Sequence, residues 1–142
     1  MISRLMFYRV LLACLLSNPI YAAGPLTEVR GDANQGREIF LDRESGHCLL
    51  CHQVAQLDAP FQGNIGPDLT NVGNRLSAQM IRAKIIDPQR SNPNSVMPAY
   101  YRTTGLTQVS KAYLNQPILN AAQIEHVVAF VKQLKAASPA ED

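Results

Sequence analysis

The sequence predicts an all-α domain, and two observations carry that prediction. Segments 77–86 and 121–135 place apolar side chains three and four residues apart, the spacing of one face of a helix. No segment shows the convincing alternation of apolar and polar residues that marks a half-buried strand. Because no internal repeat or low-complexity segment interrupts the chain, we expect a single domain.

The first 23 residues have the layout of a secretory signal peptide. Arg4 and Arg9 form a charged front, an apolar run follows at residues 10–16, and small residues end at Ala22 and Ala23. The pattern predicts cleavage after Ala22 or Ala23, leaving one domain at 24–142 with its core at about 31–135. The apolar run is too short for a membrane-spanning helix, which needs about 20 residues.

A lipoprotein anchor at Cys14 is the weaker alternative, because Arg9 leaves almost no apolar stretch before it. Removal of the signal also changes the charge balance. The chain has 13 Lys and Arg against 11 Asp and Glu, and two arginines lie in the signal. The mature domain is therefore close to neutral, without the basic surface typical of nucleic-acid binding.

The first helix is expected at Ala33–Leu41, with Asp32 as its N-cap. Gly36 and Phe40 are four residues apart and share a face of this helix. A glycine inside a helix costs stability relative to alanine. Either another element approaches the helix closely at Gly36, or the glycine is simply tolerated there.

A second helix is expected from Ser77 to about Ile86, with Met80 on its apolar face. Pro88 ends it, because the residue before a proline is pushed out of helical geometry. The chain is then loop-rich from residue 88 to residue 117. A loop of this length in a compact domain needs a reason, and wrapping one face of a bound group would be one.

The last helix is expected to follow Asn120, which forms a capping box with Gln123, and to end near Lys135. Its apolar residues recur at helical spacing and give a strong amphipathic stripe. The stripe comprises Ile124, Val127, Val128, Val131 and Leu134. His126 points away from this stripe, which predicts a solvent-facing position for it.

The run Cys-Leu-Leu-Cys-His at residues 48–52 is typical of c-type haem attachment. Cys48 and Cys51 can form thioethers with the two vinyl groups of one porphyrin, and His52 can ligate its iron. Half of a zinc site would need two more ligands, for which only His47 and His126 are loose candidates. A redox dithiol belongs near a βαβ pattern, which is absent. We therefore expect one covalently bound haem c.

The second axial ligand of the iron has several candidates. Met80 is expected to pack in the core, His126 to face solvent, and His47 to lie too near the first cysteine to reach across the ring. Met97 lies in the proline-rich loop, where Pro98 stiffens the backbone beside it. A thioether opposite a histidine also raises the reduction potential, which suits an electron carrier. We favour Met97, with water and the other side chains as alternatives.

Gly66–Pro67 could present a carbonyl to His52, or it could be an ordinary turn. The order of a glycine-containing first helix, C-x-x-C-H, Gly-Pro-x-Leu, a methionine loop and an amphipathic last helix resembles the class I c-type cytochromes. In that fold the first and last helices cross closely, which would explain Gly36, with Phe40 and Phe130 near the crossing. The resemblance also implies that the Pro67 carbonyl accepts a hydrogen bond from His52.

The chain further resembles the SoxX family, the small monohaem subunits of SoxAX complexes in bacterial thiosulfate oxidation. The resemblance covers about residues 31–134, and the order and spacing of its pieces are fairly specific. These pieces are Ile65–Leu69, Ile86–Pro88, Asn92–Tyr101, Gln116–Leu119 and Ile124–Phe130.

This resemblance implies a periplasmic electron-transfer subunit of a heterodimeric enzyme, an L-cysteine S-thiosulfotransferase. A SoxA-type partner would hold the reacting sulfur, SoxYZ would carry it, and a soluble cytochrome would accept electrons from the haem ligated by His52 and Met97. No catalytic residue is expected in this chain. The alternatives are a free-standing monohaem electron carrier and a haem protein with an open sixth position.

Overall fold

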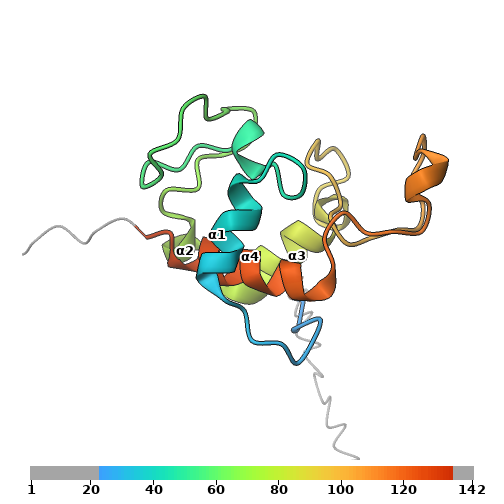
Figure 1. The fold of residues 1–142 in the computed structure, drawn as a ribbon, viewed down its shortest axis with the longest axis horizontal. Helices are drawn as coiled ribbons and strands as arrows, with labels where there is room; N and C mark the ends of the chain where they lie inside the picture. The colour runs from blue at the N-terminus through green and yellow to red at the C-terminus, as the bar shows by residue number, and fades with distance from the viewer. Residues whose placement is uncertain (1–22, 136–142) are drawn as a thin grey trace, which may run out of the picture.

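Helices and loops make up the whole of the described chain, residues 23–135, in the computed structural model (Figure 1). The α-helices are α1 (Ala33–Leu41), α2 (Val72–Arg75), α3 (Ala78–Ile86) and α4 (Ala121–Gln133). The single 3-10 turns are η1 (Cys48–Leu50), η2 (Pro88–Arg90) and η3 (Lys111–Tyr113). No strand occurs between residues 23 and 135, so the prediction of an all-α fold is confirmed for this range.

The expected signal peptide lies, except for Ala23, outside the described residues. Between residues 23 and 135, no helix has both the length and the apolar character needed to cross a bilayer.

The three expected helices begin at their predicted caps. The Asp32 carboxylate accepts from the N–H groups of Asn34 and Gln35 in the first turn of α1, and the Ser77 hydroxyl accepts from the Met80 N–H at 3.2 Å. In α4, Asn120 and Gln123 exchange two bonds of 2.9 Å between side chain and backbone. The predicted bounds of α1 and the predicted end of α3 are confirmed, whereas α4 ends two residues earlier than expected.

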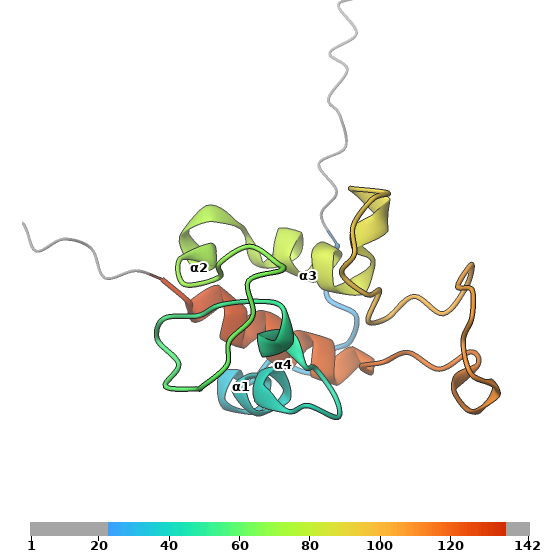
Figure 2. The ribbon, with the colours of Figure 1, turned by 90° about the horizontal axis from the view of Figure 1, so that it is seen from above.

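α1 and α4 cross each other (Figures 1 and 2). At Gly36 the backbone of α1 lies directly against the backbone of α4. A Cβ at Gly36 would overlap the carbonyl oxygen of His126 and lie 2.9 Å from the Cβ of Phe130. Beside this point the rings of Phe40 and Phe130 meet edge to face, with centroids 5.3 Å apart and planes at 63°. The interpretation of Gly36 as a point of close approach is therefore confirmed.

The expectation of a solvent-facing His126 is wrong. Its side chain is buried, and its Nδ1 accepts a hydrogen bond of 2.9 Å from the backbone N–H of Asp32. The apolar stripe of α4 faces the core, and the segment that leads into α1 packs on a second face of α4. A helical wheel of the last helix alone does not show that another segment buries this second face.

A buried ion pair, which was not anticipated, joins α3 to α4. Arg82 donates to both carboxylate oxygens of Glu125, over 2.8 and 2.7 Å. The same pair holds the start of the domain, because Arg82 also donates to the Ala23 carbonyl at 2.8 Å and Glu125 accepts from the Leu26 N–H at 3.0 Å. Burial opposes ionisation of Glu125, but these bonds outweigh it and lower the pKa of the carboxyl.

The long loop after α3 has two different parts. Residues 88–100 return along α3, and many of them line a cavity described below. Residues 103–118, which we call the arm, project from the body of the domain (Figures 1 and 2). The arm exposes four large apolar side chains: Leu106, Tyr113, Leu114 and Ile118. The expectation that the loop wraps a bound group therefore fits its first part and is wrong for the arm.

Substitution of Gly36 by alanine should destabilise the domain by about 1–3 kcal/mol, because the added methyl group forces α1 away from α4. Helix propensity alone would predict the opposite effect, because alanine stabilises a helix relative to glycine. Urea unfolding of the holoprotein, followed by circular dichroism, measures it. Gly24→Ala is the matched control, since a Cβ there meets nothing within 4 Å. Equal effects of the two substitutions would contradict the close crossing.

Glu125→Gln should cost about 3–5 kcal/mol at pH 7, because Arg82 then lies buried without its ionised partner. The lowered pKa of Glu125 means that its ionic contribution is present above the ordinary value of 4.5 and is lost as the pH falls through the folded-state value. The difference in unfolding free energy between the two proteins should therefore shrink toward pH 3. A difference that stays constant from pH 7 to pH 3 would contradict this assignment.

Candidate functional site

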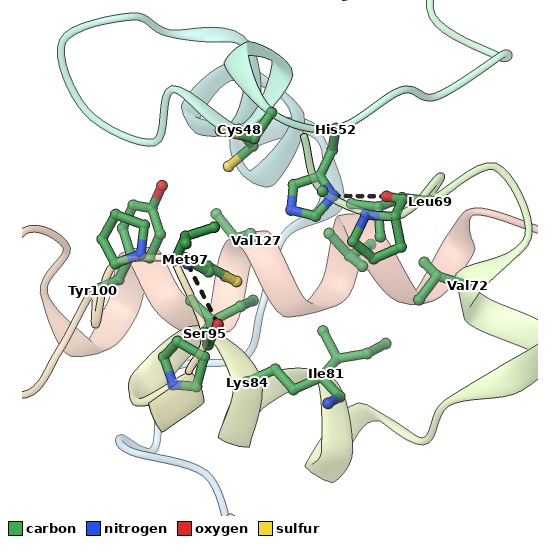
Figure 3. A pocket seen from close by; sticks show the side chains of 18 of the residues that line it. Cys48, His52, Leu69, Val72, Ile81, Lys84, Ser95, Met97, Tyr100 and Val127 are labelled. Carbon is green, nitrogen blue, oxygen red and sulfur yellow. Dashed lines mark hydrogen bonds between the residues drawn. The ribbon is translucent and has the colours of Figure 1, made fainter. Parts of the chain in front are cut away.

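A cavity of about 480 Å³ lies between η1, α3, α4 and the loop that follows α3 (Figure 3). Its volume falls within the range of about 300–1,000 Å³ that small-molecule and cofactor sites occupy. Apolar side chains from three helices form much of its wall. They are Phe40 of α1, Ile81 and Ile85 of α3, and Val127 and Val131 of α4.

η1 and the two residues that follow it present Cys48, Cys51 and His52 to this cavity. The turn follows His47, whose backbone is left-handed with φ of 50°. The N–H groups of Cys51 and His52 both donate to the Cys48 carbonyl, at 3.2 and 3.0 Å. This tight turn brings Cys48, Cys51 and His52 to one wall of the cavity, and both cysteines are free thiols. Two thiols on one wall suit attachment to a single bound group.

The surroundings of Cys48 argue against a redox dithiol. Burial raises the pKa of the Cys48 thiol to about 12. A catalytic C-x-x-C pair needs the opposite shift, because the reacting species is the thiolate. The raised pKa of Cys48 therefore disfavours thiol exchange at this position.

The imidazole of His52 is fixed by the backbone of the next loop. Its Nδ1 lies 2.7 Å from the Pro67 carbonyl oxygen, and a Cβ at Gly66 would overlap the ring. A carbonyl oxygen only accepts hydrogen bonds, so Nδ1 carries the proton and Nε2 of the neutral ring keeps a lone pair. Nε2 is then the nitrogen available to a metal ion. The interpretation of Pro67 as the acceptor for His52 is confirmed.

Met97 lines the cavity from the loop after η2, across from the wall that carries Cys48 and His52 (Figure 3). Its N–H donates to the Ser95 hydroxyl at 3.3 Å. The other candidates are placed differently. Met80 is half-buried on α3 and is not among the lining residues, and neither is His126, whereas His47 lines the cavity at the start of η1.

Sequence reasoning gave no role inside the domain to Tyr100, which the structure buries. Its hydroxyl donates to the Gly46 carbonyl at 2.7 Å, and burial raises the pKa of the phenol, so it remains a donor. The bond joins the methionine loop to the loop before η1. The two residues are 54 positions apart, and no local pattern indicates such a pair.

These residues fit a covalently attached haem. The cavity is walled by apolar side chains, two thiols face it from one turn, and a histidine with a fixed tautomer stands directly after the second thiol. The thioether of Met97, which also lines the cavity, is a soft donor of the kind that haem iron accepts. Cys48 and Cys51 would hold the porphyrin through thioethers, and His52 would approach the iron through Nε2.

Comparisons with known proteins agree with this geometry. The family model for cytochrome c matches residues 33–135. Among solved structures, the crystal structure of SoxXA from P. pantotrophus contains a similar chain with a TM-score of 0.75 and 32% sequence identity. The match covers 81% of this chain and 90% of that one. No curated protein sequence gives a significant match.

Proposed function

This chain belongs to the cytochrome c family, as a cytochrome of the SoxX type with a covalently bound haem c, and from that premise we propose that it is a periplasmic electron carrier with His52 and Met97 as axial ligands. The haem supplies one electron-transfer centre, since its iron accepts and releases a single electron. The observation that carries the proposal is the bond from His52 to the Pro67 carbonyl, which leaves Nε2 for the iron.

The surroundings of the two ligands suit electron transfer. The Pro67 carbonyl orients the His52 ring and raises its basicity as a ligand. The apolar walls limit the access of water, and a thioether ligand favours the reduced iron. Both of these effects raise the reduction potential, whereas the more basic histidine lowers it. An occupied sixth position would distinguish this protein from haem proteins that bind oxygen or peroxide.

The export proposal rests on the pattern of the first 23 residues. The folded domain favours one of the two candidate cleavage sites. Arg82 donates to the Ala23 carbonyl, and the Ala23 N–H donates to the Gln79 carbonyl at 3.4 Å. Cleavage after Ala22 keeps Ala23 in the mature chain and preserves the bond to Arg82, so it is the site that we propose.

The likeness to SoxXA supports a heterodimer with a SoxA-type cytochrome. The partner would hold the sulfur undergoing oxidation during transfer of thiosulfate to a cysteine of SoxYZ, and this chain would pass the electrons to a soluble cytochrome. Its two mature cysteines are both committed to the haem. The arm supplies a surface of the right kind for a permanent partner, since it exposes large apolar side chains and Lys111 is its single charged residue.

The alternative function is that of a free-standing monohaem carrier, which has the same fold and the same ligands. It differs from the subunit proposal in one respect, which is the absence of a fixed partner. Whether the chain forms a stable complex with a partner therefore distinguishes the two functions.

Met97→Ala should remove the methionine-to-iron charge-transfer band from the spectrum of the oxidised holoprotein and lower the reduction potential, because water or an added ligand replaces the thioether. Absorption spectra and redox titration measure both effects. Met80→Ala is the matched control, since Met80 lies on α3 outside the cavity lining, and it should keep the band. An unchanged spectrum in the Met97 variant would rule out His/Met ligation.

Co-expression with a SoxA-type cytochrome should give a heterodimer in size-exclusion chromatography. Leu114→Asp in the arm should weaken that assembly while leaving the haem spectrum unchanged, because a charge replaces an exposed apolar contact. Phe61→Asp is the control, since Phe61 is 92% exposed and lies outside the arm. Elution of the unmodified chain as a monomer would contradict the subunit proposal, and equal effects of the two variants would contradict the role of the arm.

A further inference from the structure

We propose that Gln89 is a positioning residue that holds Met97 on the sixth-ligand side of the haem cavity. The inference rests on the proposed ligation by Met97 and adds a residue that neither the motif nor the family comparison points to. Gln89 belongs to η2, the short turn that follows α3, and its side chain is half-buried.

Gln89 uses its amide nitrogen to hold the methionine loop at two points. Its Nε2 donates to the Met97 carbonyl at 2.7 Å and to the Ser95 carbonyl at 3.1 Å. Both amide protons are therefore engaged, and both acceptors lie within the segment that carries the proposed ligand. The bonds join residues 95–97 to η2, which is continuous with α3 through Asp87.

A second set of contacts fixes the orientation of the amide itself. The Oε1 atom of Gln89 accepts from an Arg102 Nη at 3.3 Å. Arg102 in turn forms an ion pair of 2.8 Å with the buried carboxylate of Asp87. Because Arg102 only donates and the loop carbonyls only accept, the amide has one orientation that satisfies all its partners.

Arg102 lies at the C-terminal end of the methionine loop. Backbone hydrogen bonds hold this end against α3: the N–H groups of Tyr100 and Tyr101 donate to the carbonyls of Ile85 and Ile86 at 3.1 and 3.3 Å. Met97 is thus held between an anchor at η2 and an anchor at the C-terminus of α3. Of these anchors, Gln89 is the one that contacts the backbone of Met97 directly.

The consequence is a closed methionine loop in which the thioether does not have to be recruited from a mobile segment. A ligand that is positioned in advance competes better with added ligands, because less conformational entropy is lost when it binds. Loss of the two Gln89 bonds should therefore release Met97 more often. An added ligand would then gain access to the iron.

Titration of the oxidised holoprotein with imidazole tests the proposal, because imidazole binds the iron only when Met97 has left it. Gln89→Leu keeps the approximate size of the side chain and removes both donors. It should raise the apparent affinity for imidazole by about ten- to hundredfold, the effect of losing one or two net hydrogen bonds. Gln89→Asn keeps the amide on a shorter side chain and should give an intermediate affinity, which also covers the case in which the leucine variant fails to fold.

Gln62→Leu is the matched control. Gln62 closes a different loop in the same way, since its Nε2 donates to the carbonyls of Leu57 and Ala59 at 2.9 and 3.2 Å. It should lower folding stability as the Gln89 variant does and leave the imidazole affinity unchanged. A loss of stability alone therefore cannot imitate the expected result.

The Met97→Ala variant distinguishes a failure of the proposed His/Met ligation from a failure of the role of Gln89. If it binds imidazole no better than the unmodified protein, His/Met ligation is wrong and the role of Gln89 fails with it. If it binds imidazole more tightly while both Gln89 variants match the unmodified protein, the ligation stands and the positioning role of Gln89 is overturned.

Discussion

The close crossing of α1 and α4 is the constraint on which the rest of the structure depends. Gly36 lets the backbones meet, and Phe40 and Phe130 then pack edge to face beside the contact. The crossing also buries His126 against the start of α1. η1 follows α1 after a short loop, so the same contact determines where Cys48, Cys51 and His52 meet the cavity floor formed by α4.

Different segments of the chain form the two sides of the cavity, and on each side a backbone carbonyl accepts the hydrogen bond that fixes the arrangement. On one side, the Pro67 carbonyl fixes the ring of His52. On the other, α3 and η2 hold the loop of Met97 through Gln89. The Tyr100–Gly46 bond connects the two sides over a long range, and the Arg82–Glu125 pair joins α3 to α4. Such an arrangement would suit the proposed electron carrier, because ligands that the protein holds rigidly would keep the reorganisation at the iron small when its charge changes.

Local features of the chain could be predicted from the sequence, because their causes lie within a few residues. Asp32, Ser77 and Asn120 cap the helices that they precede, and C-x-x-C-H specifies its own turn. The burial of His126, the Arg82–Glu125 pair and the Gln89 bonds could not be predicted in this way. Each depends on a partner brought close by the fold. The projection of the arm could not be predicted either, because its apolar residues do not reveal which surface they face.

Ligation of the iron by His52 and Met97 is tested most directly by the methyl resonances of the methionines in the reduced holoprotein, labelled with ¹³C at the methionine methyl groups. A methyl group held over the porphyrin face experiences a strong ring-current shift to high field. The proposed ligation predicts one such resonance, assigned to Met97, with the methyl group of Met80 in the ordinary range. A Met97 methyl resonance in the ordinary range would contradict it.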